Sequence, residues 1–241
     1  MSNRLGRFQS QDEESYFEKR KNLLKKQDTE FIADNPYLFA TRQETGDTLA
    51  RVELFQKISD IPGYIVECGS NSGNHLMLFA LLSTVYEPYA INRKIISFDT
   101  FDGFRSINTE ADGELSERDF SNADFDLLEK CVNIYDMNRH LSHMNKIRLI
   151  KGDAVETIPE WKHQNKEVVI SLLYLDFDIY EPTLVALENL FELVPKGGIV
   201  AFDQFSYENF PGETLAFKEK LGLDYSLKKF SYHPFISYFV K

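Results

Sequence analysis

The sequence is short of several features that would assign a protein class directly. Its 241 residues contain two cysteines, Cys68 and Cys131, whose separation matches neither a zinc-ligand pair nor a disulfide framework. No apolar run approaches the roughly 20 residues that a membrane-spanning helix requires. The opening stretch MSNRLGRFQS also lacks the apolar segment of a signal peptide. We therefore expect a cytoplasmic protein without a membrane partner.

Positive charge is scarce as well. Lysine and arginine number 27 against 38 aspartate and glutamate residues, which gives a formal net charge of -11 and a pI near 5.0. Such a field repels the phosphates of nucleic acids, and no basic stripe offsets it, so we expect no nucleic-acid partner. The 43% of apolar residues is typical of a globular chain that can bury one sizeable core.

Apolar strands and amphipathic helices alternate along the chain. Strands are expected within 61–69, 94–99, 147–151, 168–175 and 198–202, and helices at 14–26, 48–58, 73–86 and 123–140, after Pro182 and near the end. Two aromatic-rich strands, 225–230 and 236–240, are close enough to form an antiparallel hairpin. This order predicts an α/β fold with a doubly wound, mainly parallel seven-stranded sheet. We expect residues 1–47 to form an N-terminal helical extension, and this extension and the acidic loop 102–122 are candidate lids.

Each expected parallel strand ends in an acidic residue or a glycine turn. The endings read VECGSNSG, FDTFDGF, KGDAVETIP, YLDFDIY and AFDQF. Scattered solubilising acids would not fall at the same end of every strand. Because ligands of open α/β sheets bind outside the carboxyl ends of the strands, we expect these residues to share one site.

The endings of the first three strands suggest a nucleoside-containing cofactor. The turn from Gly69 to Gly73 is not a dinucleotide fingerprint, because its spacing differs and the first strand already ends in Glu67. Gly69 would let the backbone approach a ligand, Asp99 suits two ribose hydroxyls, and Asp153 suits an adenine amino group. An acidic rim disfavours a pyrophosphate but suits a sulfonium, so S-adenosylmethionine fits better than NAD.

At these residues the chain resembles the class I S-adenosylmethionine-dependent methyltransferases, and among them the macrocin O-methyltransferases that modify deoxysugars. The matching stretches are PGYIVECGSNSG, FDTFDGF, KGDAVETIP, LLYLDFDIYEPTLVALENLFELVPKGGIVAFDQF and FPGETLAFKE. The resemblance implies a Rossmann-like methyltransferase domain at 48–241 and a homodimer. It implies cofactor contacts from Glu67, Gly69, Ser70 and Gly73 to the methionine end, from Asp99 to the ribose and from Asp153 to the adenine.

The same resemblance implies a divalent metal, usually magnesium, on Asp176 and Asp203. The third position is Gln204, where the sugar-modifying enzymes usually have a second aspartate, and an amide oxygen is an acceptable ligand for magnesium. The metal would orient the acceptor hydroxyl and lower its pKa, and Asp176 would take the proton. This chemistry would explain why a buried strand runs into carboxylates, which are costly to desolvate unless they are used.

Three hypotheses about function follow. The first is O-methylation of a nucleotide-linked or glycan-borne deoxysugar, with a small molecule or a glycan as the acceptor. The second is methylation of a catechol-like hydroxyl, which Gln204 leaves open. The third is a non-catalytic binding module or an oxidoreductase; the intact Asp176 and Asp203 argue against the module, and the missing dinucleotide fingerprint argues against the oxidoreductase. Asp178 has a second interpretation as a helix N-terminal acid. His75 follows the glycine turn, where it would either touch the cofactor or lie on the helix surface.

Overall fold

The computed structural model describes residues 11–117 and 119–241. The chain divides into two compact units, Met1–Asp47 and Thr48–Lys241. The first unit contains α1 (Gln11–Leu24), α2 (Thr29–Asp34) and α3 (Pro36–Phe39). Within the described residues, no helix is both long enough and apolar enough to cross a membrane.

Helix α4 (Arg42–Lys57) begins six residues before the expected start at residue 48. The reason is a capping box just ahead of it. The Glu44 N–H donates to Thr41 Oγ1 at 3.1 Å, and the Thr41 N–H donates to Glu44 Oε2 at 2.8 Å. These two bonds satisfy donors that the first turn of a helix would otherwise leave without partners.

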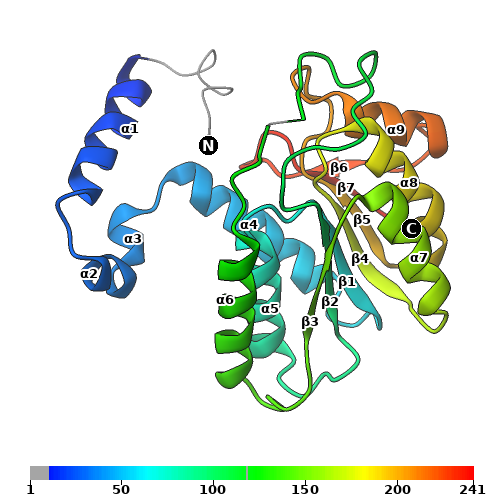
Figure 1. Ribbon diagram of the computed structural model, residues 1–241, viewed down its shortest axis with the longest axis horizontal. Coiled ribbons are helices and arrows are strands. Elements are labelled where there is room, and N and C mark those ends of the chain that lie inside the picture. Colours follow the sequence, from blue (N-terminus) through cyan, green and yellow to red (C-terminus); the bar gives the residue numbers. More distant parts are fainter. Residues whose placement is uncertain (1–10, 118) are drawn as a thin grey trace. The chain divides into compact units, whose positions relative to one another are not determined.

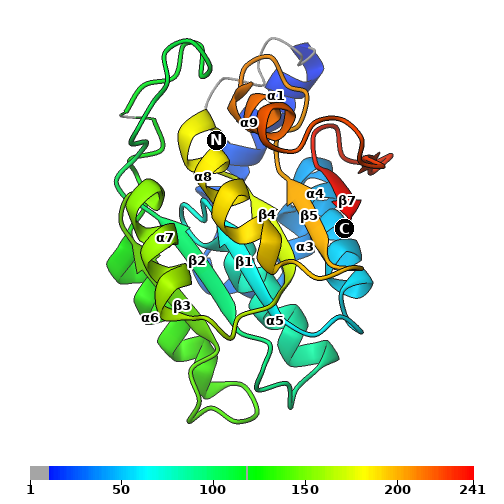
Figure 2. The ribbon, with the colours of Figure 1, turned by 90° about the vertical axis from the view of Figure 1, so that its right-hand side faces the viewer.

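The second unit contains one seven-stranded sheet in the order β3-β2-β1-β4-β5-β7-β6 (Figures 1 and 2). The strands are β1 (Tyr64–Cys68), β2 (Ile95–Asp99), β3 (Ile147–Lys151), β4 (Ile170–Leu175), β5 (Ile199–Phe202), β6 (Lys228–Lys229) and β7 (Ser237–Val240). Strands β1 to β5 are parallel, whereas β7 is antiparallel to both β5 and β6. The prediction of a doubly wound sheet with a C-terminal antiparallel hairpin is confirmed.

Helices cover both faces of this sheet. Strand residues that alternate in sequence enter two separate cores, and β4 contributes to both because all six of its residues are buried. One core contains α7 (Ala154–Gln164), α8 (Tyr180–Leu190) and α9 (Gly212–Lys220). The other contains α5 (Asn74–Tyr86), α6 (Phe125–Met137) and the part of α4 from Ala50 onward. Figure 2 shows the sheet with α7 and α8 packed along one face.

Two further elements, α7 and β6, differ from the sequence expectation. No helix was assigned to residues 152–167, yet α7 forms there although Pro159 cannot donate a backbone hydrogen bond. Its buried residues Ala154, Ile158 and Trp161 recur at helical spacing, so packing outweighs the proline. Strand β6 is shorter than the expected 225–230, because the Leu227 N–H bonds back to Tyr225 O at 2.9 Å and turns the chain.

Candidate functional site

The carboxyl ends of β1, β4 and β5 meet at one edge of the sheet. The Asp176 N–H donates to Cys68 O at 2.7 Å, and the Asp203 N–H donates to Leu175 O at 2.9 Å. These bonds continue the parallel ladder one residue past each strand. The structure therefore brings together Gly69, Asp176 and Asp203, as the sequence analysis expected.

Gly69 is required by the close approach of the β4 end. Its φ is +95°, and a Cβ at this position would lie 2.0 Å from Asp176 O and 2.5 Å from Asp176 C. A side chain would push the Asp176 backbone away. The backbone position of Asp176 thus depends on the absence of a side chain at Gly69.

Asp99 joins the glycine turn to the loop after β2. Its Oδ2 accepts the Asn71 N–H at 2.7 Å, and its Oδ1 accepts the Phe101 N–H at 2.6 Å. Burial raises the pKa of this carboxyl, and the two backbone donors oppose that rise. Each carboxylate oxygen has a further lone pair, so Asp99 can still accept ribose hydroxyls. Next to it, the hydroxyls of Ser70 and Ser97 share a hydrogen bond.

The remaining cofactor candidates lie along the same edge with structural contacts of their own. Asp153 is the N-cap of α7, where it accepts the Val155 N–H at 3.0 Å and the Ser106 hydroxyl at 2.8 Å. Gly73, with φ +78°, is the N-cap of α5 and packs against Leu128. A contact between Asp153 and a cofactor would therefore add to an existing capping role.

Glu67 is completely buried within β1. Among the described residues, neither of its carboxylate oxygens has a hydrogen-bond partner. Burial raises its pKa to about 8, and the nearby positive groups His75 and Arg51 counteract only part of this. Burial thus favours the protonated form of Glu67, and no hydrogen-bond donor among the described residues compensates its carboxyl group for the lost hydration.

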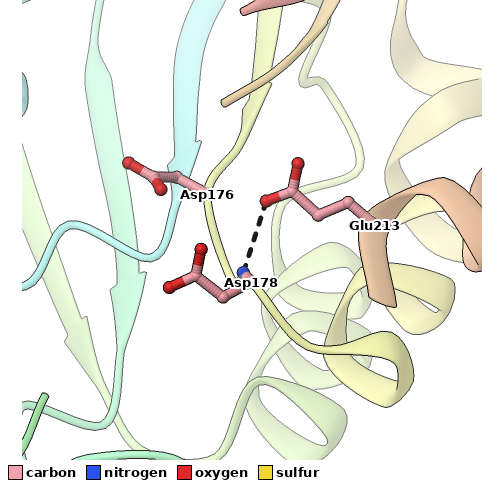
Figure 3. Close-up of side chains that lie close together, drawn as sticks. All are labelled: Asp176, Asp178 and Glu213. Carbon is pink, nitrogen blue, oxygen red and sulfur yellow. Dashed lines mark hydrogen bonds between the residues drawn. The ribbon is translucent and has the colours of Figure 1, made fainter. Parts of the chain in front are cut away.

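Three carboxyl groups converge beyond the ends of β4 and β5 (Figure 3). One oxygen from each of Asp176, Asp178 and Glu213 lies within 4.8 Å of the others. Glu213 comes from α9, where its Oε1 accepts the Asp178 N–H at 3.3 Å and its Oε2 accepts the Gln204 N–H at 3.2 Å. Burial raises the pKa of Glu213 well above its usual range. Burial and the charge of Asp203 raise the pKa of Asp176 to about 7.

Asp203 lies beside this group but is held by buried donors. Its Oδ1 accepts hydrogen bonds from Arg51 Nη2 at 2.7 Å and from the Tyr174 hydroxyl at 2.5 Å. Its Oδ2 faces the Gln204 amide nitrogen at 3.4 Å. Asp203 is thus close enough for its charge to act on Asp176, and Gln204 contacts Glu213 through its backbone N–H.

Sequence reasoning missed the contributions of Arg51 and Glu213, and it left His75 between a cofactor contact and a place on the helix surface. His75 is not a simple helix-surface residue, because its Nδ1 lies 2.9 Å from Arg51 Nη2 and 3.8 Å from Asp176 Oδ2. The Arg51–Asp203 contact spans 152 positions in sequence, so no local pattern could reveal it. Glu213 lay inside the matching stretch FPGETLAFKE, which was the available signal.

Asp178 lies where the acidic group and the start of α8 meet. It has φ +63° and directly precedes Ile179, the N-cap of α8, which makes no side-chain capping bond. The Tyr180 N–H is bonded to Asp112 Oδ1 at 2.7 Å, so an acid from loop 102–122 caps this helix. The carboxyl of Asp178 belongs to the acidic group, and its interpretation as a helix N-terminal acid stays a prediction.

The chemistry of the site suits a cation. The acidic group offers hard oxygen donors, and burial first, then the charges of neighbouring carboxylates, raise the pKa values of Asp176 and Glu213. A divalent cation such as magnesium, which prefers carboxylate and amide oxygens, would relieve this repulsion. The residues present therefore fit the metal that the resemblance implies.

Comparison with known proteins identifies the family. The family model for macrocin O-methyltransferase (TylF) matches residues 10–234. The crystal structure of CalS11, a calicheamicin methyltransferase, is 33% identical with a TM-score of 0.90, covering 96% of this chain and 93% of that chain. The apo structure of CalS11, described as a TDP-rhamnose 3'-O-methyltransferase, is 32% identical with a TM-score of 0.84, covering 96% of this chain and 95% of that chain.

A more distant structure supports the fold alone. The O-methyltransferase NovP is 17% identical with a TM-score of 0.63, covering 81% of this chain and 79% of that chain. No protein with a curated description matches the sequence. The match of the family model over nearly the whole chain and the identity to CalS11 confirm the resemblance read from the motifs. The chain belongs to the macrocin O-methyltransferase (TylF) family.

Proposed function

We propose that this O-methyltransferase transfers the methyl group of S-adenosylmethionine to a hydroxyl of a deoxysugar. The observation that carries the proposal is the group of buried carboxyls beside the glycine turn, in a chain that belongs to a sugar O-methyltransferase family. A nucleotide-linked deoxysugar is the acceptor class to test first, because the relative CalS11 is described as acting on TDP-rhamnose.

The cofactor would lie across the ends of β1, β2 and β3. Glu67, Gly69, Ser70 and Gly73 would line its methionine end, while Asp99 would accept from its ribose and Asp153 from its adenine. Methyl transfer is an in-line displacement at a carbon that the sulfonium already activates. The protein must therefore align the acceptor oxygen with the methyl group and remove one proton.

Asp176 is the residue proposed to take that proton. Its pKa of about 7 is close to the value at which a carboxylate is both ionised and basic enough near neutral pH. Its side chain is 16% exposed and its backbone is fixed against the glycine turn, so it can face both cofactor and acceptor.

A divalent metal completes the proposal. Asp176 and Asp203 would hold magnesium, with the Gln204 side-chain oxygen as a third ligand; Asp178 and Glu213 are the alternative partners of Asp176. When bound, the metal would lower the pKa of the acceptor hydroxyl and orient it. Asparagine or glutamine substitutions at Asp203 and Glu213 would separate the two sets, since only ligands should lose metal affinity strongly.

Assembly, location and the role of the N-terminal unit are further parts of the proposal. We propose a homodimer, from the family resemblance, and a cytoplasmic location, because the relative CalS11 is described as a biosynthetic enzyme. We also propose a lid role for residues 1–47. Light scattering of the purified protein tests the dimer. Deletion of residues 1–47 tests the lid, which predicts reduced methyl transfer with cofactor binding retained.

The function is tested by calorimetry with S-adenosylhomocysteine and by an assay with nucleotide-linked deoxysugars. We expect cofactor binding and methyl transfer in the wild type. Asp176→Asn should lower turnover by about 10²- to 10⁴-fold, the range for loss of a general base, while cofactor binding stays. The control is Asp126→Asn, an exposed aspartate on α6. Absence of cofactor binding in the wild type would sink the methyltransferase assignment.

A further inference from the structure

Asp203 receives two hydrogen bonds on one oxygen from inside the protein. Arg51 and Tyr174 both have no exposed surface, and both donate to Asp203 Oδ1, at 2.7 Å and 2.5 Å. They also support each other, because the Arg51 guanidinium carbon lies 4.9 Å from the centre of the Tyr174 ring. The three side chains come from α4, β4 and the end of β5.

Burying these polar groups is an unfavourable way to stabilise the fold. Burying an arginine and a tyrosine hydroxyl costs desolvation free energy that a hydrogen-bonded partner must offset. A pair of apolar side chains would fill the same space without that cost. The polar arrangement does something that apolar packing could not, since it fixes the rotation of one carboxylate.

The rotation is fixed in a particular sense. Oδ1 points inward to the two donors, and Oδ2 points to the Gln204 amide nitrogen at 3.4 Å, which is beyond an ordinary hydrogen-bond length. Asp203 thus keeps one oxygen for the protein interior and presents the other toward the side of the site where Gln204 lies. A carboxylate held in this way loses less conformational entropy when it binds a ligand.

We propose that Arg51 and Tyr174 are positioning residues that orient Asp203 so that its Oδ2 ligates the divalent cation. This inference rests on the proposed function, because it assigns a task toward the metal of that site. Neither residue touches the reacting atoms. Each acts through Asp203, in the manner of outer groups that orient metal ligands and whose loss lowers metal affinity by about 10- to 100-fold.

Tyr174→Phe is the sharper of the two tests. It removes a single donor, keeps the ring packed against Arg51 and changes no charge. We expect the affinity for Mn²⁺, used as a spectroscopic probe in place of magnesium, to fall by about 10-fold in the protein saturated with S-adenosylhomocysteine. Calorimetry and the electron paramagnetic resonance of Mn²⁺ measure this without turnover, and the affinity for S-adenosylhomocysteine should not change.

Tyr135→Phe is the matched control. Tyr135 is also buried and donates to Ala80 O at 2.8 Å, but it lies on α6 away from Asp203. Its loss should leave Mn²⁺ affinity at the wild-type value. At Arg51, lysine should retain more Mn²⁺ affinity than methionine, because lysine keeps a donor for Asp203 although it cannot reproduce the guanidinium geometry.

The outcomes separate the inference from the function beneath it. If Tyr174→Phe keeps the wild-type affinity for Mn²⁺ while Glu213→Gln loses Mn²⁺ binding, the inference is overturned. The metal would then be assigned to Asp178 and Glu213. If the wild type binds the cofactor but no Mn²⁺, the proposed metal site is wrong, and so is the positioning role of Arg51 and Tyr174. Weakened Mn²⁺ binding in Tyr174→Phe but not in Tyr135→Phe would support it, even if the Arg51 variants fail to fold.

Discussion

The two halves of the strand-end site handle negative charge in opposite ways. In the half proposed to bind the cofactor, called the cofactor half below, backbone donors hold the carboxylates: Asp99 accepts two N–H groups, and Asp153 accepts one at the start of α7. In the acidic half, Asp176, Asp178 and Glu213 face one another. One half is stabilised by dipoles that the fold supplies, and the other depends on a proton or a cation.

Magnitudes explain why the acidic half cannot be satisfied in the same way. Two unit charges about 4 Å apart repel by about 4 kcal/mol at an effective dielectric constant near 20. A hydrogen bond to a charged group contributes about 1.5–3 kcal/mol. The two backbone hydrogen bonds that Glu213 accepts therefore contribute a free energy of the same order as the repulsion from one neighbouring carboxylate. Glu213 has more than one such neighbour. A bound proton or cation is needed to tip the balance.

The largest effect should come from breaking the junction between the halves with Gly69→Ala. The new Cβ would meet the Asp176 backbone at 2.0 Å, and the positive φ adds strain, so we expect a loss of about 3–5 kcal/mol in unfolding free energy and loss of turnover. Urea denaturation measures the stability. Gly222→Ala has a similar backbone, φ +72°, with nothing within 4 Å of the added Cβ, and should cost only about 1–2 kcal/mol. Equal losses in both variants would show that the contact with Asp176 is unimportant.

A second prediction concerns pH and applies to the protein kept in chelator. The pKa of Asp176 is raised from 3.8 to about 7, and that of Glu67 from 4.5 to about 8, so the folded state binds protons that the unfolded state has released. The stabilisation that these two groups contribute is fully present below about pH 4. It is lost progressively as the pH rises from there to about 7 for Asp176 and about 8 for Glu67. The slope should approach about 1.4 kcal/mol per pH unit for each group.

Urea denaturation at a series of pH values checks this slope. Asp176→Asn should flatten the part that belongs to Asp176, and magnesium should flatten it too if the cation replaces the proton. If the free energy of unfolding in chelator rises toward pH 8, Asp176 and Glu67 are not the groups that dominate its pH dependence.

The smallest effect should come from the cofactor half. In Asp99→Asn one oxygen can still accept a backbone N–H, but the new amide group faces the second donor, at a cost of about 1–3 kcal/mol. We expect about a 10-fold loss of S-adenosylhomocysteine affinity with Mn²⁺ binding unchanged. Asp102→Asn in the same loop is the control, because its carboxylate is exposed and pairs with Arg105. A change in Mn²⁺ binding would show that the two halves are not independent.

The sequence predicts the central sheet well for a physical reason. Strands β1, β2, β4 and β5 are buried on both faces, so each is a mostly apolar run bounded by turn residues, whereas the edge strand β3 is partly exposed. The sequence did not predict helix α7, because Pro159 lies inside it. The helix forms because Trp161 is buried at helical spacing from Ile158 and Ala154. The capping box of Thr41 and Glu44 was legible as TRQE and would have placed the start of α4 correctly.

The site was predictable where one residue type at a strand end carries the signal, and not where contacts are long in sequence. Asp176, Asp203 and Asp99 follow strands, so strand order alone brings them to one edge. Arg51 comes from mid-helix, and its partner Asp203 is fixed only once β4 and β5 are paired and α4 is packed against them. The motif also could not show that a loop acid, Asp112, caps α8 and leaves Asp178 facing the acidic group.

Asp99 has one further consequence, for cofactor engineering. Because its two oxygens accept hydrogen bonds from Asn71 of the glycine turn and Phe101 of the next loop, Asp99 connects the two loops that would form the proposed ribose site. Redesign for analogues with altered ribose hydroxyls thus cannot treat Asp99 as a replaceable recognition residue. A designer would first have to re-join the two loops by other means, and only then change what the pocket selects.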